Sequence, residues 1–213
     1  MRIMAIGAHY DDIELGCGGV LARFVQKKHH VHAIIITTSN YKYYDGKVMR
    51  TEIQAQKEGF NALHKLGIDT ISNLQYATKE VPYNSEITEK LNQIIDKYAP
   101  DLIITHHLED SHRDHYNTIK SVLGAGRNCK NIWMFEPLFS SNLSNKGFNP
   151  TLYVDISDTI NIKIKSIKAH RSQYNRYGKG WINLIKARAR VRGIEIQTNY
   201  AEAFEIIKQK YII

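Results

Sequence analysis

The sequence predicts an α/β fold, with a Rossmann-like, mostly parallel sheet and helices on both of its faces. Short apolar runs of strand length alternate with stretches of helical spacing, which is the pattern of βαβ units. Ionisable side chains also gather directly after two of these runs. Because ligands bind at the carboxyl ends of the strands in such sheets, we expect the active site at that edge. A single domain over residues 1–213 is expected.

The expected strands are apolar runs too short for buried helices, and the continuous run at 31–37 is typical of a strand buried on both faces. These strands cover 2–7, 31–37, 69–74, 101–105, 131–136 and 152–156. Helical spacing places helices at about 17–28, 48–66, 85–98, 114–125, 158–169 and 181–191. Gly67 and Pro100 end the second and third helices, and Ser85 caps the third. Residues 203–207 close the chain as a strand or short helix.

The first cluster of ionisable side chains follows the strand 2–7. It contains His9, Asp11, Asp12 and Glu14, and a Gly-rich stretch comes after it. Imidazole and carboxylate together suit Zn2+ and neighbouring divalent metals. His9 and Asp12 lie three residues apart and can face one ion, whereas Asp11 between them is free to take a proton from a metal-bound water.

A second cluster follows the strand 101–105. The segment 105–115 holds four His and three acidic residues, a density that packing alone does not explain. Since both clusters follow strands, we expect them at the same edge of the sheet, where the second supplies a further metal ligand.

The two clusters together resemble the PIG-L/LmbE-like family of zinc-dependent sugar N-deacetylases. The shared motifs are His9-x-Asp11-Asp12-x-Glu14 and His112-x-Asp114-His115. Tyr10 and Arg113 stand where the family usually has Pro, a departure that leaves the ligands in place but changes loop rigidity and substrate fit. Further matching segments are 50–52, 170–173 and 200–204, so the resemblance covers nearly the whole chain.

The resemblance implies a role for each motif residue. His9, Asp12 and His115 would be the metal ligands, and Asp11 the general base. His112 would be protonated and stabilise the oxyanion or assist the leaving amine, with Asp114 orienting it. Three protein ligands leave a position open for water, as a catalytic zinc site requires.

Four further residues are candidate substrate contacts. Arg50 contacts substrate or developing charge by resemblance, and its expected place in a first helical turn is unfavourable for a cation, an inconsistency typical of functional sites. Tyr43 lies in a tyrosine-rich loop at the active edge, where aromatic faces suit sugar rings, although solvent-exposed tyrosines are also common in loops. His170 and Gln173 approach the site by resemblance, although a His at a helix end also commonly faces water.

The net charge and the distribution of charged residues inform the expected partners. The net charge is +8, and ten Lys or Arg but no acidic residue lie between 163 and 192. This segment is typical of a surface for an anionic substrate, a membrane or nucleic acid, but also of an ordinary solvated helix face or a subunit contact with acidic partners. The segment carries no nucleic-acid motif, so no nucleic-acid partner is expected. His29, His30 and His32 precede a strand and are expected on the surface. By analogy with the family we expect a homo-oligomer.

The expected location is the cytoplasm. Met1 leads directly into the first strand, no apolar stretch approaches the ~20 residues of a membrane span, and the two Cys make no disulfide framework.

The sequence leaves three hypotheses for the function. The leading hypothesis is a hydrolase that removes acetyl from an N-acetylated amino sugar, with Zn2+ as cofactor, although two His and one carboxylate also accommodate Fe2+, Mn2+ or Co2+. The second keeps the site but changes the substrate to a nucleotide-, lipid- or thiol-linked sugar conjugate, including anionic ones. The third is a nucleotide-binding module without activity, which the absence of G-x-G-x-x-G disfavours.

Overall fold

The computed structural model describes residues 1–137 and 147–210. Its centre is a seven-stranded sheet in the order β5-β2-β1-β6-β7-β9-β8. These strands are β1 (Arg2–Gly7), β2 (His30–Thr37), β5 (Thr70–Tyr76), β6 (Leu102–Thr105), β7 (Ile132–Phe135), β8 (Leu152–Asp155) and β9 (Ala201–Lys208). The first five in spatial order pair in parallel, whereas β9 is antiparallel to both β7 and β8. The predicted mostly parallel α/β fold is confirmed.

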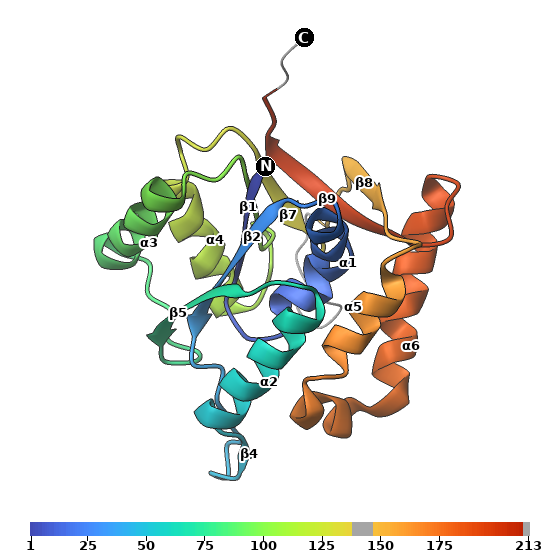
Figure 1. Ribbon diagram of the computed structural model, residues 1–213. Coiled ribbons are helices and arrows are strands. Elements are labelled where there is room, and N and C mark those ends of the chain that lie inside the picture. The colour runs from blue at the N-terminus through green and yellow to red at the C-terminus, as the bar shows by residue number, and fades with distance from the viewer. Residues whose placement is uncertain (138–146, 211–213) are drawn as a thin grey trace.

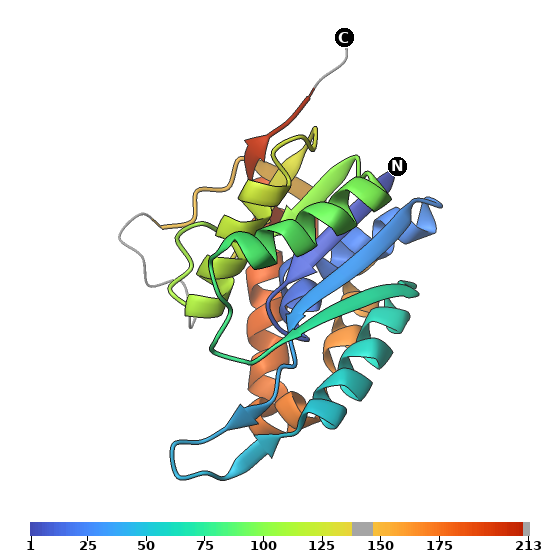
Figure 2. The same cartoon turned by 90° about the vertical axis from the view of Figure 1, so that its left-hand side faces the viewer.

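Helices cover both faces of this sheet (Figures 1 and 2). They are α1 (Asp12–Gln26), α2 (Glu52–Lys65), α3 (Ser85–Tyr98), α4 (Arg113–Ala125), α5 (Ile160–Ile167) and α6 (Arg171–Glu195). One apolar core packs α3 and α4 against the sheet, and the other packs α1, α2, α5 and α6 against its opposite face. The result is three layers, with the strand ends of β1 and β6 at the middle of one edge.

A small hairpin lies outside the main sheet, and it corrects one prediction. Strands β3 (Tyr41–Lys42) and β4 (Val48–Arg50) pair antiparallel, and Thr51 then caps α2 by accepting a hydrogen bond from the Gln54 N–H. The predicted helix 48–66 therefore begins four residues later. Arg50 belongs to a strand, so the argument from an unfavourable place in the helix dipole was wrong.

Other boundaries also differ from the predictions. Helix α1 begins at Asp12 rather than near residue 17, because the helix passes through a kink at Cys17. The last long helix begins at Arg171 and is interrupted at Gly178, whose positive φ of 68° suits glycine. The chain end forms a strand, β9, which was one of the two alternatives for this segment.

The expected surface position of His32 was wrong. Its side chain is buried, Nε2 lies 2.8 Å from Ser72 Oγ, and its ring packs against Tyr98. His30 is exposed, as expected.

Candidate active site

The sheet brings the two clusters of ionisable side chains together. Strands β1 and β6 are direct neighbours, with Ala5 opposite Ile104, so the loop after β1 and the segment after β6 leave the same edge side by side. Asp12 opens α1 from the first loop, and His112 caps α4 from the second. The expectation that both clusters share one edge is confirmed.

Tyr10, which replaces the family's usual Pro, anchors the first loop. Its side chain is fully buried against Gly59 and Phe60 of α2, and its hydroxyl accepts a hydrogen bond from Asn73 Nδ2 at 2.8 Å. Its backbone N–H donates to Ser39 Oγ. Packing and hydrogen bonds thus hold the loop where the family pattern uses proline.

The loop fixes Asp11 in a strained backbone conformation. Its φ is 123°, a region that a non-glycine residue adopts at a cost of about 1–3 kcal/mol. Burial, followed by the nearby charge of Asp12, raises the pKa of the Asp11 carboxyl to about 6. A carboxylate with its pKa in this range is suited to accept and release a proton near neutral pH.

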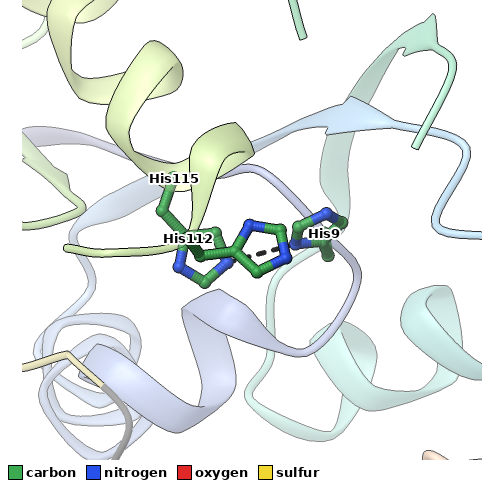
Figure 3. A group of neighbouring side chains, drawn as sticks. All are labelled: His9, His112 and His115. Carbon is green, nitrogen blue, oxygen red and sulfur yellow. Dashed lines mark hydrogen bonds between the residues drawn. The ribbon is translucent and has the colours of Figure 1, made fainter. Parts of the chain in front are cut away.

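The three predicted metal ligands face one another. His9 Nδ1 lies 3.2 Å from His115 Nε2, and the carboxylate of Asp12 lies 3.4 Å from each of these nitrogens. Figure 3 shows the rings of His9 and His115, which come from the loop before α1 and from α4, turned toward each other with His112 beside them. We call His9, Asp12 and His115 the donor cluster.

A carboxylate holds the far side of each histidine in the donor cluster. Asp114 Oδ2 lies 2.9 Å from His9 Nε2, and Asp110 Oδ2 lies 2.8 Å from His115 Nδ1. Such a carboxylate fixes the tautomer, so that the nitrogen facing the cluster carries the lone pair. Asp114 therefore supports His9 with its side chain, which corrects the expectation that it orients His112 in this way.

The chemistry of the donor cluster fits a divalent cation. Two imidazole nitrogens and a carboxylate all present lone pairs to the same small space, an arrangement that needs positive charge between them. When no ion is bound, protons on the two histidines supply that charge. Burial lowers the pKa of each histidine, but the Asp12 charge raises it by more, so the pKa of His9 is about 9 and that of His115 is about 10.

His112 is the N-cap of α4. Its Nδ1 accepts a hydrogen bond from the Asp114 backbone N–H at 3.3 Å, and its ring stacks on His115. Burial, together with the charges of His115 and His9, lowers the pKa of His112 to about 4. Because Nδ1 accepts the hydrogen bond from Asp114, the ring carries a proton on Nε2 and is a hydrogen-bond donor there.

The site contains two supporting residues to which the sequence analysis assigned no role, His106 and Asp110. The Ala8 N–H donates to His106 Nε2, which also lies 3.2 Å from Asp12 Oδ2. Within the described residues, two groups of three possible metal donors lie close together. One is His9, His112 and His115, and the other is Asp12, His106 and His115. His115 is common to both groups, which puts it at the centre of the site. The density of His in 105–115 was the signal that pointed to these residues.

Near Asp11 lies a buried ionic network of Arg50, Glu58, His170 and Glu14. Arg50 Nη2 lies 3.0 Å from His170 Nδ1 and 3.3 Å from Glu58 Oε2, and Nη1 donates to the Tyr10 carbonyl. His170 Nε2 lies 2.9 Å from Glu14 Oε1, and the Ser172 N–H donates to Glu58. We call these four residues the rear network.

Two of the expected substrate contacts are buried. Arg50 is 3% exposed and His170 is 0% exposed, and Arg50 contacts the loop that carries Asp11 through the Tyr10 carbonyl. Tyr43 is 41% exposed at the hairpin, and Gln173 is half-buried near the start of α6.

A cavity of about 620 Å3 lies between α2, α5 and the start of α6. None of its lining residues belongs to the donor cluster. A smaller cavity of about 10 Å3 is lined by Asp12, His106 and His115. No helix in the described ranges is long and apolar enough to cross a membrane.

Comparison with known proteins identifies the family of the chain. The profile of PIG-L, described as GlcNAc-PI de-N-acetylase, matches residues 4–125, a stretch that contains both motifs of the site. The class is thus that of α/β de-N-acetylases. The chain belongs to the PIG-L family.

Individual relatives agree with this assignment. The chain is 33% identical to the uncharacterized deacetylase YaiS of Escherichia coli K12, over 80% of this chain and 90% of the relative. It is 25% identical to the diacetylchitobiose deacetylase of Thermococcus kodakarensis, over 81% and 70% of the two chains. The crystal structure of the conserved protein TT1542 from Thermus thermophilus shares the fold, with a TM-score of 0.83, 22% identity, and coverage of 99% and 96%.

Proposed function

We propose that the protein is a metal-dependent hydrolase that removes the acetyl group from an N-acetylated amino sugar of the N-acetylglucosamine type. The family assignment and the deacetylase names of the relatives support the reaction. The observation that carries the proposal is the donor cluster, where three lone-pair donors converge beside a raised-pKa carboxylate.

His9, Asp12 and His115 would hold the metal, and Zn2+ is the first candidate for two imidazoles and a carboxylate. Fe2+, Mn2+ and Co2+ suit the same donors. When bound, the metal supplies Lewis acidity, which polarises the acetyl carbonyl and lowers the pKa of water.

The side chains around the cluster divide the proton transfers. Asp11 accepts a proton from the attacking water on its carboxylate, and the water oxygen bonds to the acetyl carbon. His112 donates a hydrogen bond from Nε2–H to the oxygen on which negative charge develops. Asp11 then returns the proton to the sugar nitrogen as the C–N bond breaks, which yields acetate and a free amine. Asp114 and Asp110 hold the ligand histidines in orientation throughout.

Amine release from a panel of N-acetylated sugars tests the proposal. The chain is assayed after chelation and after reloading with Zn2+, Fe2+, Mn2+ or Co2+ in turn. Release that chelation abolishes and one of these metals restores is the expected result. A chelated protein that remains fully active would refute metal dependence, and a loaded protein inactive on every sugar would refute the substrate class.

The family assignment argues against the hypothesis of a nucleotide-binding module without activity. The homo-oligomer and the cytoplasmic location stay predictions of the sequence. The sugar-conjugate hypothesis concerns the surface beside the donor cluster.

A further inference from the structure

The cavity of about 620 Å3 between α2, α5 and the start of α6 lies in the outer helical layer and contains no residue of the donor cluster. Helix α2 lies beside α5, and α6 begins a few residues after α5 ends (Figure 1). The Ser166 hydroxyl donates to the Ala62 carbonyl at 2.7 Å, which joins α5 to α2. The walls of the cavity are therefore held together by the fold itself.

Four of the eight residues that line this cavity are cationic, and none is acidic. Lys65 comes from α2, Lys165 from α5, Lys168 from the turn after α5, and Arg171 from the first turn of α6. All four are exposed. Within residues 1–137 and 147–210, none of them forms an ion pair or donates a side-chain hydrogen bond. We call this space the basic cavity.

The charges of the basic cavity repel one another when it is empty of anions. Lys165 and Lys168 are three residues apart, a spacing at which like charges destabilise a helix. Glu58 of α2 does not compensate them, because its carboxylate faces Arg50 and Ser172. Cations on a single flat helix face are each solvated, whereas these come from three segments around one hollow, where the field is focused on an anion.

The volume and the charge together indicate the class of ligand. A cavity of about 620 Å3 lies within the range of about 300–1,000 Å3 that small-molecule sites occupy. A phosphate monoester carries a charge of about −1.5 to −2 at pH 7, so two such groups match four positive charges. Arg171 offers a planar fork of N–H donors to a phosphate, and the lysines offer point charges.

The residues on either side of Arg171 contact the rear network. His170 Nδ1 lies 3.0 Å from Arg50 Nη2, and the N–H and hydroxyl of Ser172 donate to the two carboxylate oxygens of Glu58 at 2.8 and 2.6 Å. Through Arg50 the rear network also contacts the loop that carries the general base. The segment 170–172 therefore connects the basic cavity to that loop.

We propose that the basic cavity binds a small molecule with two phosphate groups, and that this binding raises activity through the segment 170–172. A phosphate held by Arg171 favours the ordered conformation of this segment and so supports the loop of Asp11. The binding is independent of the proposed deacetylase function, whereas the effect on turnover rests on it.

Calorimetry with fructose 1,6-bisphosphate, inorganic phosphate and fructose tests the binding. Metal-loaded and chelated protein are expected to bind the bisphosphate with the same Kd, more tightly than phosphate, and not to bind fructose. Lys65→Gln and Lys168→Gln each raise this Kd by about two- to fivefold, and their effects multiply in the double variant. Added salt weakens binding. Lys57→Gln is the matched control, because it removes an exposed charge of α2 outside the cavity.

Two outcomes overturn the site. One is a bisphosphate that does not bind, or that binds with a Kd unchanged in the double variant. The other is binding of the protein to phosphatidylserine vesicles, lost in the double variant, without binding of the bisphosphate, which would assign the four charges to a membrane surface.

Amide hydrogen exchange and turnover test the coupling in the metal-loaded protein, with the methyl glycoside of N-acetylglucosamine as substrate. Saturating bisphosphate is expected to slow exchange of the Ser172 N–H and to raise kcat/KM by about fivefold. Both effects should disappear in the double variant. Bound bisphosphate that changes neither quantity overturns the coupling. Binding and slower exchange in a protein that hydrolyses no acetamido sugar overturn the proposed reaction and support the site.

Discussion

The donor cluster and the rear network contain similar residue types, but hydrogen-bond donors face acceptors only in the rear network. Both combine buried histidine with carboxylate, and charges from both act on the Asp11 carboxyl. In the rear network Arg50 faces Glu58, and His170 bridges Arg50 and Glu14, so donors meet acceptors. In the donor cluster His9, Asp12 and His115 turn lone pairs toward one another. Residue type alone does not distinguish a metal centre from a structural network, but the match of donors to acceptors does.

Removing a donor-cluster ligand should give the largest effect on function. His115→Ala is expected to abolish metal binding and activity, since His115 belongs to both groups of close donors in the described ranges. The fold should persist, because the substitution relieves a cluster of facing acceptors. Metal content by elemental analysis, activity and circular dichroism check this. A variant that retains full metal occupancy would show that the ion is held elsewhere.

A substitution at Asp11 tests its role as the general base beside the donor cluster. Asp11→Asn is expected to lower kcat by about 10²–10⁴-fold, the usual contribution of a general base, while metal content stays at the wild-type level. Asn also tolerates the positive φ of this position better than most residues. Single-turnover kinetics with matched metal analysis makes the measurement, and undiminished turnover would reassign the base.

The rear network should respond in stability rather than in metal binding. Arg50→Met leaves Glu58 without its buried partner, and breaking such a pair costs about 3–5 kcal/mol of unfolding free energy. Metal affinity should change little, because Arg50 contacts no member of the donor cluster. Denaturant unfolding and metal titration, run on the same preparation, compare the two quantities. Lys57→Met on the exposed face of α2 is the control.

The carboxylates that back the ligands should have an intermediate effect on metal affinity. Asp114→Asn removes the charge that fixes the His9 tautomer, and such supporting groups are worth about 10–100-fold in affinity. Competition with a chelator of known affinity measures it. Asp158→Asn, at an exposed position before α5, should leave the affinity unchanged.

The smallest expected effect is a pH dependence confined to the chelated protein. The folded-state pKa values of His9 and His115, about 9 and 10, lie above the unfolded value near 6.5. Their contribution to stability is therefore complete below about pH 6.5 and is lost as the pH rises through 9 and 10. Bound metal replaces these protons, so the loaded protein should keep a flatter profile. Thermal unfolding from pH 6 to 10, with and without chelator, makes the comparison.

The sequence could predict the parts of this molecule that depend on local pattern. Apolar runs located the central strands, and the clusters after 2–7 and 101–105 located the active edge. Adjacency of β1 and β6 then brought His9 and His115 together, as parallel-sheet geometry requires.

Parts that depend on contacts between distant segments escaped prediction. Arg50 was assigned to a helix because helical spacing cannot reveal its pairing with Tyr41. His170 is buried by Glu14 and Arg50, which lie 156 and 120 residues away in the chain. Asp114 lies two residues after His112 in sequence, yet its carboxylate turns toward His9. Side-chain direction at such sites is set by tertiary packing, which residue spacing does not encode.

The contact between Tyr10 and Gly59 has a consequence for protein engineering. A Cβ on residue 59 would collide with the Tyr10 ring, so the two positions are compatible only as a large and a small partner. Restoring the family's proline at position 10 would empty the space beneath the loop, and a larger residue at 59 would refill it. Libraries that vary these two positions jointly should yield active combinations that neither single change permits.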